Sequence, residues 1–187
     1  MKMLEKYIKE EGFVRGNQIL DVSNFLNSKV DAKLMQALGK DFAERFNDYD
    51  FDVIITVEAS GIAPAVFASL YLNKPLIIIK KQSRVIDEEV YVQQESYSYT
   101  KDISYFLTTK RRLIKNQRCI LIDDFLAKGS VVKNVEKLLN KENATLLATG
   151  ICITKGFQDG FKYLSDHGYD LYSQVTLKTL QPNIEFE

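Results

Sequence analysis

The chain has 187 residues, of which 45% are hydrophobic and 27% are charged, as expected for one globular domain with an ordinary core. Its 25 basic and 25 acidic residues give a formal net charge of zero, so bulk charge does not favour nucleic-acid binding. No apolar run approaches the length of a membrane span, and Met1–Lys6 leads into a charged, amphipathic segment. We therefore expect a cytoplasmic protein without a secretory leader, folded as a single domain over residues 1–187.

Two cysteines and one histidine leave little scope for metal-cluster or nucleophilic chemistry. Cys119 and Cys152 fall in predicted buried strands, without a second pair that would indicate zinc binding or a disulfide framework. His167 precedes Gly168 at a predicted helix end, where we expect a surface side chain. The sequence thus predicts no Ser/His or Cys/His nucleophile.

The predicted elements begin with a short amphipathic helix that stops at Gly12, an edge strand over residues 17–22 and a turn at 23–24. A strong amphipathic helix is expected over about 31–46, because four large apolar residues recur there at every fourth position. Strands and helices then alternate. The predicted strands are 53–57, 76–79, 118–122, 146–153 and 171–177, and the predicted helices are 61–72, about 131–141 and 157–167.

This alternation is typical of an α/β fold with an open, mostly parallel sheet and helices on both faces. The segment 82–117 interrupts it. The segment is polar and rich in tyrosine, with strand-like pieces at 89–93 and 96–100 and no obvious helix. Because a long excursion inside a compact domain is usually a working loop or a disordered one, we predict a mobile loop over about 82–117.

The segment from Arg118 to Ser130 is the most informative part of the chain. Cys119–Ile122 run apolar without a break, as in a strand buried on both faces, and Asp123 and Asp124 follow at its carboxyl end. The loop around Gly129 then leads into a helix whose free N–H groups can bind an anion. Acids beside a phosphate-binding loop suggest a sugar-phosphate ligand. The alternatives are a solvated turn that caps the helix, and a magnesium-holding corner of another phosphate enzyme.

Two further strand ends should meet this corner, because parallel strands place their carboxyl ends on one edge of the sheet. Glu58, Ala59, Ser60 and Gly61 form a small-residue turn into a helix, which suits a diphosphate, although such a turn can also serve packing alone. Lys81 can add positive charge there, or can be a solvated strand exit. We predict Glu58, Ala59, Ser60 and Lys81 as weaker candidates for pyrophosphate binding.

The segment Ile120–Gly129 resembles the phosphoribosyl pyrophosphate (PRPP) motif of the type I phosphoribosyltransferases. Four more segments are similar to the bacterial xanthine phosphoribosyltransferases of that family, in matching order and spacing; they are 17–27, 57–65, 96–101 and 153–158. The resemblance implies the type I fold with a small hood, built mainly from residues 1–30 and the C-terminal segment, and a homodimer. It also implies reversible transfer of the phosphoribosyl group from PRPP to a purine, releasing pyrophosphate. Mg²⁺ would be bound mainly by PRPP, without a direct protein ligand.

The resemblance also assigns roles to individual residues. Asp123 and Asp124 would be the catalytic pair that holds the ribose hydroxyls. Leu20 and Asn27 would lie in the hood over the purine, and Lys155 would contact a ring oxygen of the base. PRPP would be bound through its 5′-phosphate by the loop residues Ala127, Lys128, Gly129, Ser130 and Val131.

The choice of base is only partly readable. Lys155 donates hydrogen bonds and accepts none, so it favours a 6-oxo purine over adenine, unless it merely caps the strand end. Thr154 and Gly156 stand where xanthine enzymes more often have Glu and Ser, a difference that can widen the choice toward hypoxanthine or guanine. Lys128 stands where the family usually has a small or amide side chain, and it can either tighten phosphate binding or point to solvent. Val131 lacks the hydroxyl that many relatives offer to the phosphate.

We expect xanthine and PRPP as partners, and neither nucleic acid nor a membrane. The alternatives are a guanine, hypoxanthine or adenine enzyme, and a PRPP-sensing regulator of the same fold. The regulator is disfavoured because the first helix leads straight into the hood segment and the chain carries no basic excess.

Overall fold

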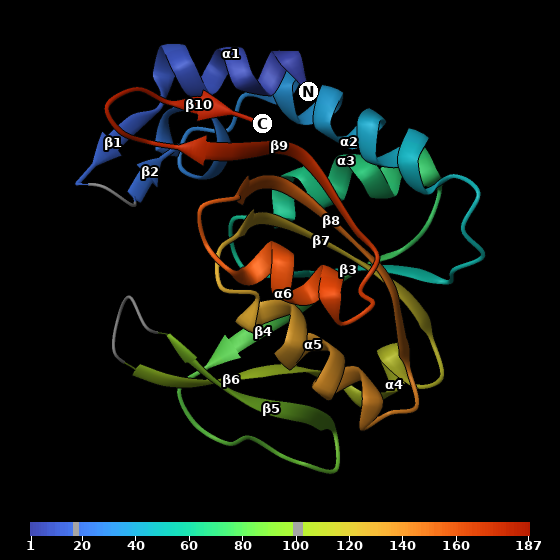
Figure 1. The fold of residues 1–187 in the computed structure, drawn as a ribbon. Coiled ribbons are helices and arrows are strands. Elements are labelled where there is room, and N and C mark those ends of the chain that lie inside the picture. The colour runs from blue at the N-terminus through green and yellow to red at the C-terminus, as the bar shows by residue number, and fades with distance from the viewer. Residues whose placement is uncertain (17–18, 99–102) are drawn as a thin grey trace.

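The computed structural model describes residues 1–16, 19–98 and 103–187. These residues form an eight-stranded sheet in the order β10-β9-β8-β7-β3-β4-β6-β5 (Figure 1). The strands are β3 (Val53–Val57), β4 (Leu76–Gln82), β5 (Tyr91–Ser98), β6 (Ile103–Lys110), β7 (Arg118–Leu126), β8 (Thr145–Lys155), β9 (Leu171–Thr179) and β10 (Glu185–Phe186). Strands β9, β8, β7, β3 and β4 are parallel to one another, whereas β10, β6 and β5 are added antiparallel at the two ends. The prediction of an open, mostly parallel sheet is confirmed.

Helices cover both faces of the parallel strands, which accounts for the unbroken apolar runs in the sequence (Figure 1). The first face packs against α1 (Lys2–Glu11), α2 (Ala32–Phe46) and α3 (Ile62–Leu72), and the second against α5 (Ser130–Asn140) and α6 (Gly160–Asp166). Successive residues of a strand serve the two cores in turn: Ile120 joins the first, and Leu121 the second. Among the described residues, no helix is both long and apolar enough to span a membrane.

The predicted helix over 31–46 is confirmed, and its start has a clear physical cause. The side chain of Asp31 accepts a hydrogen bond from the backbone N–H of Leu34 at 3.0 Å, which caps the first turn. The apolar stripe of α2 is fully buried, namely Leu34, Leu38, Phe42 and Phe46. Gly39 lets α2 approach α3 closely, because a Cβ atom there would lie 2.4 Å from Cβ of Phe67.

The N-terminal segment differs from the predicted edge strand and turn. It forms a two-stranded antiparallel hairpin, β1 (Phe13–Arg15) with β2 (Ile19–Asp21), followed by the π-helix η1 (Ser23–Asn27). Residues 17 and 18 of the resembling segment lie outside the described residues. The C-terminal strand β10 lies beside this unit, and Nζ of Lys9 is 5.2 Å from the ring centroid of Phe186 (Figure 1).

The segment predicted as a long loop over 82–117 is largely regular secondary structure, which corrects that expectation. β5 and β6 pair antiparallel over their whole length, and the short helix α4 (Arg111–Ile114) follows. Their polar residues hide the strand pattern, since the buried positions include Ser96, Thr108 and Thr109 as well as Val92 and Leu107. Asn134 of α5 donates to Oγ of Ser96 at 2.9 Å. Residues 99–101 of the resembling segment 96–101 lie outside the described residues.

Candidate active site at the carboxyl edge of the sheet

The acid pair lies within a strand rather than after one, because β7 extends to Leu126. Asp123 is 7% exposed and pairs in register with Ile151 of β8, while Asp124 is half-buried. The backbone N–H of Asp124 donates to Oδ1 of Asp123 at 3.0 Å. The strand continues past the predicted end because β8 is also long and pairs with it as far as Leu126.

The two carboxyl groups lie side by side in largely buried positions. Burial, followed by the neighbouring charge of Asp124, raises the pKa of Asp123 well above its ordinary value, and burial also raises the pKa of Asp124. Within the described ranges, neither forms an ion pair with a lysine or arginine. Such a pair favours a ligand that brings hydroxyl donors or positive charge.

The turn after β3 brings the predicted diphosphate site against the acid pair. Oε1 of Glu58 accepts a hydrogen bond from the backbone N–H of Lys81 at 2.6 Å, which ties this turn to β4. The peptide bond between Glu58 and Ala59 is cis. A Cβ atom at Gly61 would lie 2.9 Å from Oδ1 of Asp123, so only glycine permits this approach.

A cavity of about 150 Å³ opens between the turn and the acid pair. It unites predicted residues from three strand ends with residues that the sequence analysis did not single out, and its lining is Val57, Glu58, Ala59, Ser60, Lys81, Asp123, Asp124, Phe125 and Val131. The expected convergence of the strand ends is therefore observed.

The carboxylate and hydroxyl oxygens of the lining are ligands that suit Mg²⁺. Among the described residues, no three His, Cys, Asp or Glu side chains are grouped to hold a metal by themselves.

The predicted phosphate loop forms a tight turn into α5. Gly129 has a φ of 75° in the left-handed region, where glycine is favoured. The backbone N–H of Gly160 donates to the carbonyl oxygen of Ala127 at 3.1 Å, so α6 supports the loop from one side. Val131 lines the acid-pair cavity, whereas Lys128 is exposed and borders a separate hollow with Lys133.

The predicted purine-binding residues are more widely distributed. Lys155, the last residue of β8, is half-buried, and burial lowers the pKa of its ammonium group. Its Nζ lies 5.7 Å from the ring centroid of Phe125, which borders the acid-pair cavity. Leu20 is buried in β2, and Asn27 is exposed at the end of η1. Lys155, Leu20 and Asn27 do not line the acid-pair cavity themselves.

Three neighbours of the site were missed in the sequence. Phe125 follows the acid pair directly and links the cavity to Lys155. Thr56 is fully buried, and its Oγ1 has no hydrogen-bond partner among the described residues. A Cβ atom at Gly156 would lie 2.5 Å from Oε1 of Glu187, which places the last residue beside the Lys155 turn. Only Phe125 carried a sequence signal, through its place in the motif.

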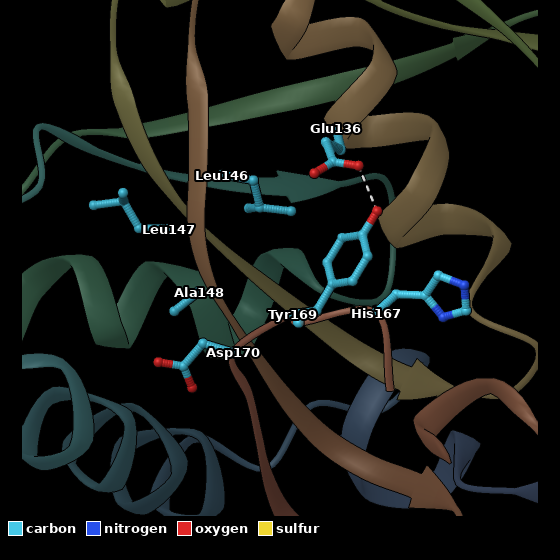
Figure 2. A pocket seen from close by; sticks show the side chains of 8 residues that line it. Glu136, Leu146, Leu147, Ala148, His167, Tyr169 and Asp170 are labelled. Atoms are coloured by element: carbon cyan, nitrogen blue, oxygen red, sulfur yellow. Dashed lines mark hydrogen bonds between the residues drawn. The ribbon is translucent and has the colours of Figure 1, made fainter. Parts of the chain in front are cut away.

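A smaller hollow of about 90 Å³ lies at the opposite edge of the sheet, where β8 and β9 begin (Figure 2). Figure 2 shows the hydroxyl of Tyr169 pointing to the carboxylate of Glu136, to which it donates a hydrogen bond, while the ring of His167 points away. His167 is exposed at the end of α6, as predicted. Asp170 accepts from Arg45 and Tyr49, so the carboxylates that line this hollow already have partners.

Comparison with known proteins extends these observations. Residues 27–171 match the phosphoribosyl transferase domain family. The chain is 41% identical over 180 residues to a xanthine phosphoribosyltransferase of Leuconostoc mesenteroides, covering 95% of each chain. It is 39% identical over 186 residues to a xanthine phosphoribosyltransferase of Clostridium botulinum, covering 98% of this chain and 97% of the relative.

Solved structures agree on the fold. The adenine phosphoribosyltransferase of Rhodothermus marinus matches with a TM-score of 0.74 at 13% identity, covering 95% of this chain and all of that one. The adenine phosphoribosyltransferase of Thermoanaerobacter pseudethanolicus matches with a TM-score of 0.65 at 22% identity, covering 78% of this chain and 82% of that one. At these identities the likeness concerns the fold alone. Together with the family match and the extended identity to curated relatives, it shows that this chain belongs to the phosphoribosyltransferases, in the group of bacterial xanthine phosphoribosyltransferases.

Proposed function

We propose that this chain transfers the 5-phosphoribosyl group from PRPP to xanthine, giving xanthosine monophosphate and pyrophosphate. The observation that carries the proposal is the buried acid pair without an ion-pair partner, which faces an anion-binding turn across one small cavity. The roughly 40% identity to xanthine enzymes over nearly the whole chain supports the choice of base.

The cavity and its rims suggest where each part of PRPP binds. The diphosphate lies against Glu58–Ser60, with Lys81 supplying positive charge from β4. The ribose hydroxyls donate to Asp123 and Asp124. The 5′-phosphate lies at the start of α5, in the loop Ala127–Val131, where N–H groups without helical partners point outward.

The acid pair contributes most as the sugar becomes cationic. The bond between C1′ and the diphosphate oxygen breaks ahead of the new bond from a purine nitrogen to C1′. The leaving group keeps the electron pair, and the purine nitrogen passes its proton to water or to the released pyrophosphate. Positive charge develops on the sugar between these events, and the carboxylates of Asp123 and Asp124 stabilise it. No covalent nucleophile is needed. Mg²⁺ bound with PRPP would neutralise the diphosphate, and Glu58, Ser60 and the acid pair offer oxygens for its hydration shell.

The purine is selected by Lys155 at the end of β8 and by the hood residues Leu20 and Asn27. The Lys155 ammonium group donates to the 6-oxo group, while Leu20 and Asn27 approach from the hood. Adenine has an amino group at that position and would leave the ammonium unpaired, with a large loss of affinity. The enzyme works in the cytoplasm as a homodimer.

A turnover assay with PRPP, Mg²⁺ and each of xanthine, guanine, hypoxanthine and adenine tests the proposal. We expect the highest kcat/KM with xanthine and the lowest with adenine. Equal or greater activity with guanine or hypoxanthine would reassign the base. Binding of PRPP without turnover of any base would favour the sensing regulator instead.

A further inference from the structure

Thr56 is a fully buried polar residue beside the acid pair. It lies in β3, between β4 and β7 of the sheet, and its side chain is 0% exposed. Among the described residues, its Oγ1 has no hydrogen-bond partner. A buried hydroxyl without a partner is unfavourable for the folded protein, and most buried polar groups do have one. The Thr56 hydroxyl is therefore a donor that is still available for a hydrogen bond.

The position of Gly61 shows how the Thr56 hydroxyl lies relative to Asp123. A Cβ atom at Gly61 would be 2.5 Å from Oγ1 of Thr56 and 2.9 Å from Oδ1 of Asp123. The two oxygens come from the adjacent strands β3 and β7, and they border the same small space at the start of α3. A side-chain rotation that brings them within hydrogen-bond distance would let the hydroxyl donate to the carboxylate.

Oδ1 is the oxygen of Asp123 that faces the protein. It accepts the backbone N–H of Asp124 at 3.0 Å, while the residue also lines the acid-pair cavity. A carboxylate oxygen can accept two hydrogen bonds, so Oδ1 has room for a second donor. Two donors on Oδ1 would fix the plane of the carboxylate and leave Oδ2 for a ligand.

We propose that Thr56 is a positioning residue for the transfer reaction: in the PRPP complex its hydroxyl donates to Oδ1 of Asp123 and so directs Oδ2 at a ribose hydroxyl. Thr56 does not line the cavity itself, so it acts through Asp123 alone. A hydrogen bond to a charged acceptor is stronger than one between neutral groups, and this bond therefore supports the carboxylate as the sugar becomes cationic. The inference rests on the proposed function for the role of Asp123, but it does not depend on which purine is used.

Thr149 provides a matched control for Thr56. It is 1% exposed, and its Oγ1 also has no hydrogen-bond partner within the part of the chain that the structure describes. It lies in β8, where its backbone N–H donates to the carbonyl oxygen of Asp170 at 2.8 Å, and it does not line the acid-pair cavity. The two threonines therefore share their burial and differ in their distance from the proposed chemistry.

Thermal unfolding without ligand tests whether the Thr56 hydroxyl is available. Valine has nearly the shape of threonine and suits a strand, and it removes the unpartnered hydroxyl. We therefore expect Thr56→Val and Thr149→Val each to melt at or above the wild-type temperature, which also establishes that both variants are folded. A lower melting temperature for Thr56→Val would show that the hydroxyl already has a partner in the free protein, and it would overturn the proposal.

Steady-state kinetics then separate the two threonines. Thr56→Val should lower kcat with PRPP and xanthine by about 10–100-fold, the range for losing a hydrogen bond to a charged group, with little change in the KM for xanthine. Thr56→Ser keeps the hydroxyl and should stay within about threefold of the wild type, and Thr149→Val within about twofold. If Thr56 served packing alone, Thr56→Ser would be worse than Thr56→Val, because serine loses the methyl group.

Calorimetric titration of PRPP with Mg²⁺ gives a second measurement, which needs no turnover. Thr56→Val should raise the Kd for PRPP by about 3–10-fold, because Asp123 is no longer directed at the ribose hydroxyls, and Thr56→Ser should bind as the wild type does. If the wild type uses another purine, the kinetic comparison is made with that purine, so a wrong choice of base would not be mistaken for failure of this inference.

Three results would overturn the role of Thr56. The first is a Thr56→Val variant with wild-type kcat. The second is a Thr56→Ser variant, or a Thr149→Val variant, that loses as much activity as Thr56→Val. The third applies to a wild type that turns over no purine, and it is a Thr56→Val variant that binds PRPP with wild-type affinity.

Discussion

Aspartates lie near both ends of β7, and their surroundings shift their pKa values in opposite directions. At its start, Arg118 donates to Asp52 through the backbone N–H at 2.8 Å and through its guanidinium group, which also pairs with Asp50. The side-chain and backbone hydrogen bonds from Arg118 lower the pKa of Asp52 from 3.8 to about 2. Near the carboxyl end, burial raises the pKa of Asp123 and Asp124 instead.

The carboxylates at the start of β7 are ion-paired, whereas, within the described residues, those near its carboxyl end are not. Carboxylates that are paired with a guanidinium group at the sheet's amino edge have nothing left to offer a ligand. Carboxylates that are buried without such a partner are costly to the free protein and become favourable only when a ligand supplies donors or positive charge. The proposed site at the carboxyl edge is therefore the end of β7 whose carboxylates remain available to a ligand.

The sharpest test of this contrast replaces one aspartate by asparagine near each end of β7. Asp124→Asn should lower kcat with xanthine and PRPP by about 10²–10³-fold, because a preorganised charge facing a developing cation is lost. The KM for xanthine should change little. Steady-state kinetics at neutral pH measure both constants.

The matched control for this variant is Asp52→Asn, which makes the same chemical change beside the start of β7. Its kcat should remain within about twofold of the wild type, since the change is remote from the reacting atoms. If Asp124→Asn raised only the KM for the purine, the acid pair would have a binding role and no part in stabilising the sugar cation.

Substitution of Lys155 should have a smaller effect, and it should act on the use of xanthine. Lys155→Met should reduce kcat/KM for xanthine by about 10–100-fold, the range for losing a charged hydrogen bond, and leave the KM for PRPP nearly unchanged. Lys162→Met is the control, because Lys162 is an exposed lysine that pairs with Asp166 within α6. An increase in the KM for PRPP alone would move Lys155 from the purine to the phosphate end.

Much of the fold was readable because the hydrophobic period is strong where helices cover both faces of the sheet. The stripe of α2 and the unbroken run Cys119–Ile122 fixed the element type there. The β5–β6 hairpin was predicted only in part, as strand-like pieces at 89–93 and 96–100. Tyr, Gln and Ser dominate β5, and cross-strand pairing rather than periodicity stabilises the two strands. The π-helix at Ser23–Asn27 has no comparable sequence signal.

The site was predictable to the extent that it consists of strand ends. Glu58, Lys81 and Asp123 meet because parallel strands place their carboxyl ends together. The position of Phe125 between the cavity and Lys155 required coordinates, since it depends on which way consecutive side chains point. The approach of Glu187 to Gly156 depends on the path of the C-terminal segment, which no local pattern encodes.

The ion pair between Asp52 and Arg118 should make the stability of the protein depend on pH. A carboxyl whose folded pKa is depressed stabilises the protein above its ordinary pKa of 3.8, and this contribution is lost as the pH falls toward the folded pKa of about 2. Asp52→Asn should therefore melt below the wild type at neutral pH, and the gap should close between about pH 4 and 2. Asp50→Asn, at a carboxylate that is 87% exposed, should show a much smaller gap. A gap that persists unchanged at low pH would mean that Asp52 acts through packing.

The buried Asp123 should give a pH dependence of stability opposite in sign to that of Asp52. A carboxyl whose folded pKa is raised penalises the folded state at neutral pH, and the penalty fades as the pH falls through the raised pKa toward 3.8. Asp123→Asn keeps an oxygen that can accept the N–H of Asp124 but removes the buried charge, so the ligand-free variant should melt above the wild type at pH 7. Each kcal/mol of relieved penalty should raise Tm by about 2–4 °C in a chain of this size. Differential scanning calorimetry without PRPP or Mg²⁺ measures it, and a lower Tm at pH 7 would show that the pair is stabilising. Opposite pH slopes for the Asp52 and Asp123 variants would establish that the carboxylate paired with the start of β7 serves stability, whereas the carboxylate near its carboxyl end is reserved for a ligand.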